Sequence, residues 1–145
     1  MAPDAPPRWG HQAPTAGRMD LVLDVVGWVH MSGGRLLAVR ARARDLLYLP
    51  GGKREPGEDD WTALSREVDE ELGVRLDRAS FRGIGVVEAP AHDQPPGTRV
   101  RMACYTAGYH GELTATGEID EWMFVDLADH HRLAPAVRAA LELTR

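Results

Sequence analysis

The pattern of apolar and polar positions predicts a chain of short strands, interrupted by one helix and closed by another. Two stretches rich in β-branched and other apolar residues, 20–30 and 35–40, flank the turn signal Ser32-Gly33-Gly34 and predict a hairpin. A short apolar run at 46–49 leads into a Pro-Gly-Gly loop. Later strands are predicted at 82–88, 98–107 and 121–125, with a loop over 91–97.

The segment after the Pro-Gly-Gly loop is predicted to be helical. Asp59 or Asp60 suits the N-cap, and Gly73 suits the position just beyond the last turn. The apolar residues between them form one stripe suited to packing on a sheet: Trp61, Leu64, Val68 and Leu72. Pro135 suits the first turn of a final helix that runs to about residue 143. This order predicts an α/β fold of the mixed α+β kind, with helices against a mixed sheet.

The first 18 residues differ from the rest of the chain. They hold four of the ten prolines and have no apolar period, so they are predicted to form an arm outside the core. This arm is expected to be flexible or to contact a partner chain through Trp9, which leaves a homodimer as an open alternative. Residues 19–145 are predicted to form a single domain.

Composition narrows the classes of function. The formal net charge of −5 argues against a dedicated nucleic-acid binder, which needs a basic face. No apolar run approaches the roughly 20 residues of a membrane span, and the N-terminus lacks a secretory pattern, so a cytoplasmic protein is expected. Cys104 is the single cysteine, and its alternation with Val100 and Met102 predicts a buried apolar role.

Three carboxylates share one face of the predicted helix. Glu67, Glu70 and Glu71 stand at positions i, i+3 and i+4, so their side chains lie on the same side and repel one another. A hard divalent cation with oxygen ligands would neutralise such a face. The alternative is a solvated acidic face partly relieved by Arg66.

The surrounding residues decide between these interpretations. From Gly52 to Val74 the chain has Gly, five residues, Glu58, seven residues, and then Arg66-Glu67-Val68-Asp69-Glu70-Glu71-Leu72-Gly73-Val74. A chance match to this pattern is on the order of one in a million. The segment resembles the signature box of the Nudix hydrolase family. The resemblance implies an α/β/α sandwich around a mixed sheet, in which the box forms a loop–helix–loop.

The resemblance also implies roles for individual residues. Metal ligands are expected at Glu67, Glu70, Glu71 and the carbonyl of Gly51, with Mg²⁺ as the cofactor and Mn²⁺ as an alternative. Arg66 is expected to orient the glutamates, and support for the box is expected from Gly52, Glu58 and Gly73. The catalytic residues implied are Glu67, Glu70, Arg66 and a later glutamate, for which Glu118 is favoured over Glu121.

The family cleaves nucleoside diphosphates linked to a variable group. A triphosphate, normal or oxidised, split into a nucleoside monophosphate and pyrophosphate is the favoured expectation. Pro90, 16 residues beyond the box, keeps ADP-ribose or a nucleotide sugar as the alternative. Capped RNA, dinucleoside polyphosphates and a non-catalytic nucleotide-binding module stay open. Substrate contacts are expected among aromatic and basic residues outside the catalytic set: Trp28, Arg40, Tyr48, Lys53 and Arg101.

Overall fold

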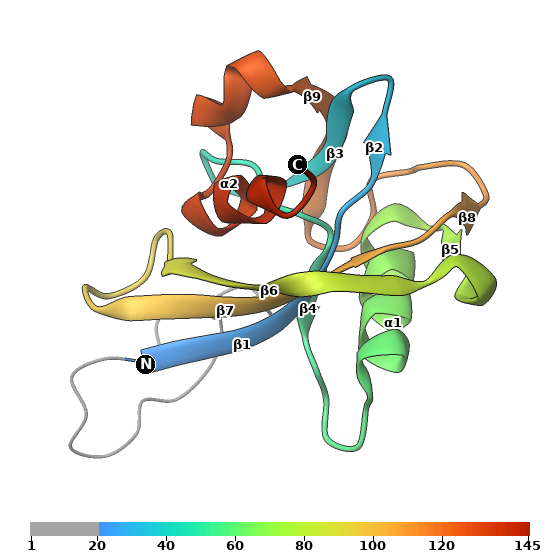
Figure 1. The fold of residues 1–145 in the computed structure, drawn as a ribbon, viewed down its shortest axis with the longest axis horizontal. Helices are drawn as coiled ribbons and strands as arrows, with labels where there is room; N and C mark the ends of the chain where they lie inside the picture. The colour runs from blue at the N-terminus through green and yellow to red at the C-terminus, as the bar shows by residue number, and fades with distance from the viewer. Residues whose placement is uncertain (1–20) are drawn as a thin grey trace.

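The computed structural model describes residues 21–145 (Figure 1). Its elements are β1 (Leu21–Trp28), β2 (Met31–Ser32), β3 (Arg35–Ala41), β4 (Gly51–Lys53), α1 (Asp60–Leu72), β5 (Arg75–Leu76), η2 (Arg78–Ser80), β6 (Arg82–Pro90), β7 (Thr98–Thr106), β8 (Tyr109–His110), β9 (Ile119–Asp126), η3 (Leu127–Arg132) and α2 (Pro135–Glu142). The predicted arm over residues 1–18 lies outside the described residues. No helix among the described residues is long and apolar enough to cross a membrane.

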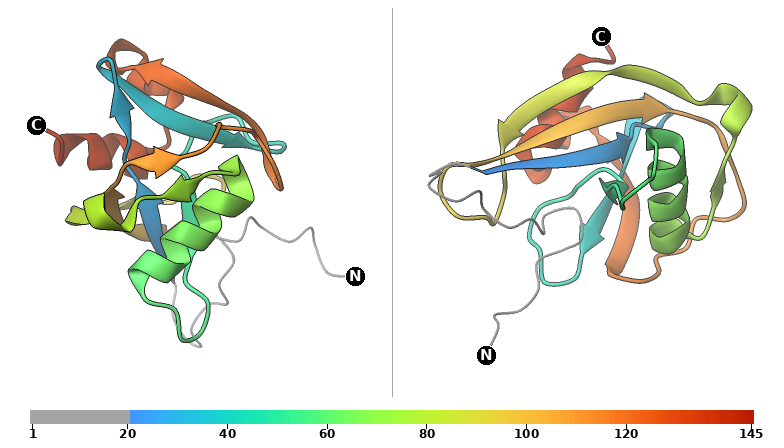
Figure 2. Two further views of the ribbon diagram at one scale, coloured as in Figure 1. Left: turned by 90° about the vertical axis from the view of Figure 1, so that its right-hand side faces the viewer. Right: turned by 90° about the horizontal axis from the view of Figure 1, so that it is seen from below.

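The largest sheet is mixed. Its order is β4-β1-β7-β6, with β1 parallel to β7 and the other neighbours antiparallel. A second, antiparallel sheet has the order β2-β3-β9, and β5 pairs with β8. The two helices lie on different sides of the large sheet (Figures 1 and 2). This arrangement confirms the predicted mixed α/β/α architecture.

The hairpin predicted between residues 20–30 and 35–40 is wrong. The first segment is β1, which pairs with β4 and β7 in the large sheet. The tight hairpin instead joins β2 to β3, with Met31 opposite Leu36. The reason is that the backbone at the end of β1 is already bonded to the large sheet: Trp28 N–H donates to the carbonyl of Pro50 at 2.9 Å, and Val29 N–H donates to the carbonyl of Tyr105 at 2.8 Å. The chain then crosses to the other sheet before it turns.

Strand β7 shows the alternation that its sequence predicts. Val100, Met102 and Cys104 are buried, whereas Arg99 and Arg101 are exposed. Burial raises the pKa of the Cys104 thiol to about 12, because the thiolate loses its hydration. The expectation of a buried, apolar cysteine is confirmed.

Helix α1 begins and ends where its capping residues predict. The Asp59 side chain accepts a hydrogen bond from the backbone N–H of Thr62 at 2.8 Å, and Gly73 takes the left-handed conformation with φ of 68°. Leu64, Val68 and Leu72 have no exposed surface, so the apolar stripe forms the predicted contact with the core. Glu67 and Glu71 are buried beside this stripe, although both carry carboxylates.

Strand β4, which the sequence predicts only as a loop, needs glycine at its first position. Gly51 has φ of 152°, and a Cβ there would lie 2.0 Å from the carbonyl oxygen of Val26. We expect Gly51→Ala to lower the free energy of unfolding by about 1–3 kcal/mol more than Gly57→Ala. Gly57 is the matched control, because it also has positive φ but has no atom within 4 Å of a new Cβ. Urea denaturation of both variants measures the difference, and equal losses would contradict this account of β4.

Candidate active site

Two buried carboxylates lie against the β4 strand. Glu67 and Glu71 on α1 are 2% and 8% exposed. Gly51 donates its backbone N–H to Glu71 Oε1 at 3.2 Å. A Cβ on Gly52 would lie 2.6 Å from Glu67 Cδ, so only glycine lets the strand approach this carboxylate. Gly51 and Gly52 therefore place the β4 backbone directly beside the acidic face of α1.

Arg66 ties the box loop to the helix. Its Nε donates to Glu58 Oε2 at 2.7 Å, and its Nη2 donates to Glu58 Oε1 at 2.8 Å. Its Nη1 donates to Glu67 Oε2 at 3.0 Å, and Nη2 also reaches the Lys53 carbonyl at 3.1 Å. The hydrogen bonds to Glu58 raise the pKa of Arg66 above its ordinary value. Arg66 thus fixes one carboxylate oxygen of Glu67 and, through its bonds to Glu58 and the Lys53 carbonyl, holds the loop against the helix.

A cavity of about 280 Å³ opens over this acidic face. Its lining residues come from α1 and from the loop before β9: Glu67, Glu70, Glu71, Gly117 and Glu118. Glu118 therefore faces the same space as the box glutamates, although it is 47 residues beyond Glu71 in the chain. The other candidate, Glu121, lies in β9 and forms an ion pair with Arg40 at 2.8 Å.

The loop before β9 is attached to the last turn of α1. The backbone N–H of Thr116 donates to the carbonyl of Glu71 at 2.9 Å, and its hydroxyl donates to the carbonyl of Glu70 at 2.6 Å. Thr114 N–H donates to the carbonyl of Leu72 at 2.9 Å. These bonds satisfy carbonyls that a helix end otherwise leaves without partners. They also fix where Glu118 stands relative to the helix.

The electrostatics of the cavity favour a cation. Burial raises the pKa of Glu71 well above its ordinary value, and the neighbouring charge of Glu67 raises it further. The donors are all carboxylate oxygens, which are the ligands that Mg²⁺ and other hard divalent cations prefer. A divalent cation therefore fits between the carboxylates of Glu67, Glu70 and Glu71. It would offset the repulsion between these three charges.

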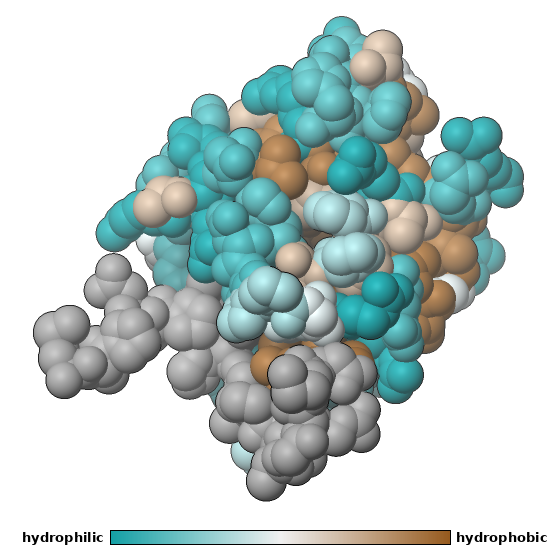
Figure 3. Space-filling model, turned by 90° about the vertical axis from the view of Figure 1, so that its left-hand side faces the viewer, coloured by the Kyte–Doolittle hydropathy of each residue, from teal (hydrophilic) through white to brown (hydrophobic). Residues whose placement is uncertain are grey.

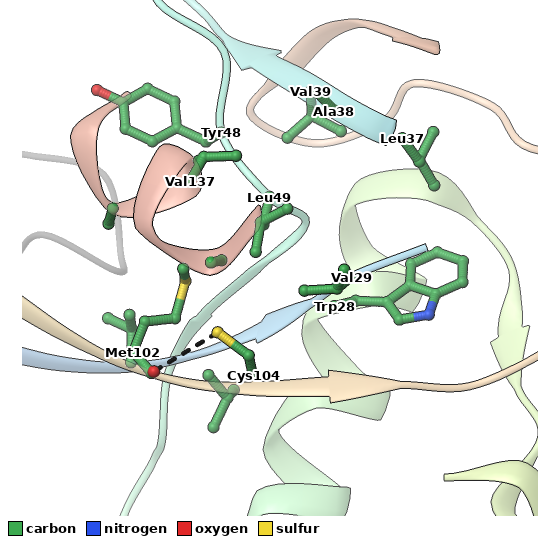
Figure 4. Close-up of a cluster of buried hydrophobic side chains, with 14 of the residues drawn as sticks. Trp28, Val29, Leu37, Ala38, Val39, Tyr48, Leu49, Met102, Cys104 and Val137 are labelled. Carbon is green, nitrogen blue, oxygen red and sulfur yellow. Dashed lines mark hydrogen bonds between the residues drawn. The ribbon is translucent and has the colours of Figure 1, made fainter. Parts of the chain in front are cut away.

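A second, apolar pocket of about 40 Å³ lies on the α2 side of the large sheet. Its walls include Leu23, Val25, Val100, Met102, Ala136 and Val137. Figure 4 shows Leu49, Met102 and Val137 gathered beside α2. Gly51 and Gly52 line this pocket as well, and the same two residues contact Glu71 and Glu67, which line the acidic cavity.

Comparison with known proteins agrees with this geometry. Residues 20–144 match the NUDIX domain family. The chain belongs to the NUDIX family. A MutT-like protein of Streptomyces ambofaciens is 39% identical over 62 residues, which are 43% of this chain and 40% of that protein. The matched part thus spans less than half the length of this curated relative.

Solved structures share the fold of this NUDIX chain. A MutT NUDIX hydrolase from Burkholderia pseudomallei is 28% identical with a TM-score of 0.72, and the match covers 88% of this chain and 100% of that one. A bifunctional NMN adenylyltransferase/ADP ribose pyrophosphatase from Francisella tularensis is 19% identical with a TM-score of 0.64, over 91% of this chain and 42% of that one. The latter likeness shows the fold alone. Family membership supports a hydrolase that acts on pyrophosphate bonds.

The structure separates the expected substrate contacts from one another. Tyr48 lines the apolar pocket, and Lys53 belongs to β4 at the start of the box. Trp28 is fully buried, and its indole N–H donates to the carbonyl of Ala107 at 3.0 Å, so the expectation that it stacks on a base is wrong. Trp28 is a core residue because its polar atom already has a partner inside the protein.

The two arginines expected at the substrate are committed to other partners. Arg101 lies on the opposite face of β7 from the pocket residues Val100 and Met102, and it donates to Glu88 at 2.9 and 3.0 Å. Arg101 therefore does not line the apolar pocket, which lies under α2 on the other face of the strand, and its contact with substrate stays a prediction. Arg40 pairs with Glu121 at 2.8 Å and lines neither hollow.

Sequence reasoning missed a polar cluster at the pocket. His92 lines the pocket and contacts Asp45 and Asp93. One ligand atom from each of these three residues lies within 4.8 Å of the others, as in many cation sites. Both segments are loops without periodicity, and the residues are 47 positions apart, so the sequence carries no signal that unites them.

The attachment of Thr116 gives a prediction about turnover. We expect Thr116→Val to lower kcat about tenfold, because the loop that places Glu118 loses its hydroxyl bond to α1. KM should change less than about twofold, since the box glutamates are untouched. Steady-state kinetics on the preferred substrate measures both constants.

Thr114→Val is the matched control for this prediction, since the Thr114 hydroxyl donates to Glu112 rather than to the helix. In a Glu118→Gln background, Thr116→Val should have little further effect, because both changes act on one group. Fully additive losses would show that Thr116 does not act through Glu118.

Proposed function

We propose that this NUDIX chain is a Mg²⁺-dependent pyrophosphohydrolase that splits a nucleoside triphosphate, normal or oxidised, into a nucleoside monophosphate and pyrophosphate. The proposal is carried by one observation: the β4 glycines that line the apolar pocket also contact two glutamates of the acidic cavity. Gly51 and Gly52 line the pocket, and the same residues contact Glu71 and Glu67. Phosphates in the cavity and a base in the pocket would then belong to one bound molecule.

The pocket supports the nucleoside half of this proposal. Its walls are almost wholly apolar, as base-binding sites usually are. The flexible side chain of Met102 lines this pocket and is suited to adjust to a ligand. Hydrophobic residues also show between hydrophilic ones on the face drawn in Figure 3.

The residues of the cavity account for the chemistry. A divalent cation held by Glu67, Glu70 and Glu71 would neutralise phosphate charge and make bound water more acidic. Glu118 lines the same cavity, and in this proposal it accepts a proton from the attacking water. Arg66 keeps Glu67 oriented toward the cavity instead of contacting substrate itself. Such a site catalyses mainly through positioning and electrostatics.

A substrate panel tests the proposal. The purified protein is incubated with Mg²⁺ and nucleoside triphosphates, oxidised triphosphates, ADP-ribose, nucleotide sugars and dinucleoside polyphosphates, and products are resolved by chromatography. We expect a nucleoside monophosphate to be released fastest from a triphosphate. Faster release from ADP-ribose would favour the alternative that Pro90, which lines the pocket, supports. No turnover of any substrate by the folded protein would favour a nucleotide-binding module.

A further inference from the structure

We infer that His92, oriented by Asp45, is the specificity-determining residue of the apolar pocket and hydrogen-bonds an N–H group on the edge of the substrate base. The inference rests on the proposed function, because it places the base in this pocket. It concerns two residues that neither the signature box nor the sequence pattern includes.

The composition of the pocket singles out His92. Among the lining residues within 21–145, only Tyr48 and His92 carry a nitrogen or oxygen in the side chain beyond the backbone. Tyr48 is 8% exposed, and burial raises its pKa, so its hydroxyl stays neutral. The His92 side chain is 19% exposed, with its ring centroid 6.1 Å from that of Tyr48. His92 is therefore the more accessible polar group of an otherwise apolar pocket.

The partners of His92 determine which ring atom remains for a ligand. Its Nε2 lies 2.7 Å from Asp45 Oδ1 and 3.3 Å from Asp93 Oδ2. An ionised carboxylate only accepts hydrogen bonds, so Nε2 carries the hydrogen. Nδ1 is then the ring atom left for a ligand, and it accepts a hydrogen bond whenever the ring carries a single proton. Asp93 is also held by Arg44 at 3.2 Å, which leaves Asp45 as the principal partner that orients the ring.

An acceptor in an apolar pocket selects a particular ligand chemistry. A base that presents an amino or lactam N–H can satisfy Nδ1, whereas a substrate without a base leaves a desolvated acceptor unpaired. A cation bound by Asp45, His92 and Asp93 is the competing explanation of the cluster. The Arg44 guanidinium already supplies positive charge to Asp93, which favours the hydrogen-bonding explanation.

Selectivity between substrates tests this inference. For wild type, His92→Ala and Asp45→Ala, kcat/KM is measured with the four common ribonucleoside triphosphates and with ribose 5-triphosphate, which has no base. The selectivity ratio is kcat/KM for the preferred nucleoside triphosphate divided by kcat/KM for ribose 5-triphosphate. We expect this ratio to fall about tenfold or more in His92→Ala. Asp45→Ala should lower the same ratio less, by about threefold. Rates with ribose 5-triphosphate should stay within about twofold of wild type.

The controls separate specificity from folding and from catalysis. His110→Ala removes an exposed histidine that does not line the pocket, and it should leave the ratio unchanged. Equal losses with all substrates in His92→Ala would reduce its role to structure and overturn the inference. Unchanged selectivity together with lost Mn²⁺ or Zn²⁺ binding, measured by calorimetry, would assign the cluster to a cation and overturn it too.

Binding measurements keep the inference testable if turnover fails. The affinities of nucleoside monophosphates and of ribose 5-phosphate are measured by calorimetry with the same variants. Failure of wild type to hydrolyse any triphosphate would refute the proposed function. Base-selective binding that disappears in His92→Ala would still support the role of this residue, and binding that is not base-selective would contradict it.

Discussion

Glu67→Gln is expected to lower kcat at least about a hundredfold while the protein stays folded. Glu67 is 2% exposed, lines the acidic cavity and accepts a hydrogen bond from Arg66 at 3.0 Å. Glutamine keeps the volume of the side chain and an acceptor for Arg66, so the change removes the charge and little else. The loss should appear in kcat at saturating Mg²⁺, measured on the preferred substrate of the panel.

Asp69→Asn is the matched control for this substitution. Asp69 is an exposed carboxylate on the same helix, two residues away, and it does not line the cavity. It should retain kcat within about twofold of wild type. If Glu67→Gln retained wild-type turnover, or if both variants lost activity equally, the acidic cavity would not be the catalytic centre.

The stability of the metal-free protein is expected to fall as pH rises above the ordinary pKa of glutamate. Burial and the charge of Glu67 raise the pKa of Glu71 in the folded state well above its ordinary value. The folded state then binds more protons than the unfolded state between the two pKa values, so protonation of Glu71 stabilises the fold below that window. Stability is lost as pH rises through the folded pKa, at up to about 1.4 kcal/mol per pH unit.

Urea denaturation in a chelating buffer at several pH values measures this dependence. The pKa of His30 is lowered by burial, so this residue makes stability rise with pH below about 6.5, in the opposite sense. The difference between wild type and Glu71→Gln isolates Glu71, because His30 is common to both. Added Mg²⁺ should stabilise wild type at high pH and do so less in the variant. A difference that does not vary with pH would contradict the raised pKa.

The box could be predicted from the sequence because its constraints are local. The caps Asp59 and Gly73, the apolar stripe and the spacing of the glutamates all act within one helix and its flanking loops. The pairing of the strands could not be predicted in the same way. β1 joins β4 and β7 instead of β3, and only contacts far apart in the chain decide that choice.

The residues of the pocket likewise divide into those that the sequence predicts and those that only long-range contacts bring together. Tyr48 was expected near the substrate because aromatic residues often bind bases, and it lines the pocket. Trp28 and Arg101 belong to equally suitable residue types, but one is buried in the core and the other lies on the far face of β7. His92 and Asp45 were missed because two loops, 47 residues apart, bring them together. Residue type predicts which side chains could bind a base, whereas the face of the sheet on which a residue lies decides whether it lines the pocket.

The identity of the products tests the central claim most directly. Phosphorus NMR of a reaction with the preferred triphosphate, run with Mg²⁺ and with a chelator, shows which bond breaks and whether the cation is needed. The account predicts a nucleoside monophosphate and pyrophosphate, formed only with Mg²⁺. Release of a nucleoside diphosphate and orthophosphate, or turnover that persists in the chelator, would contradict it.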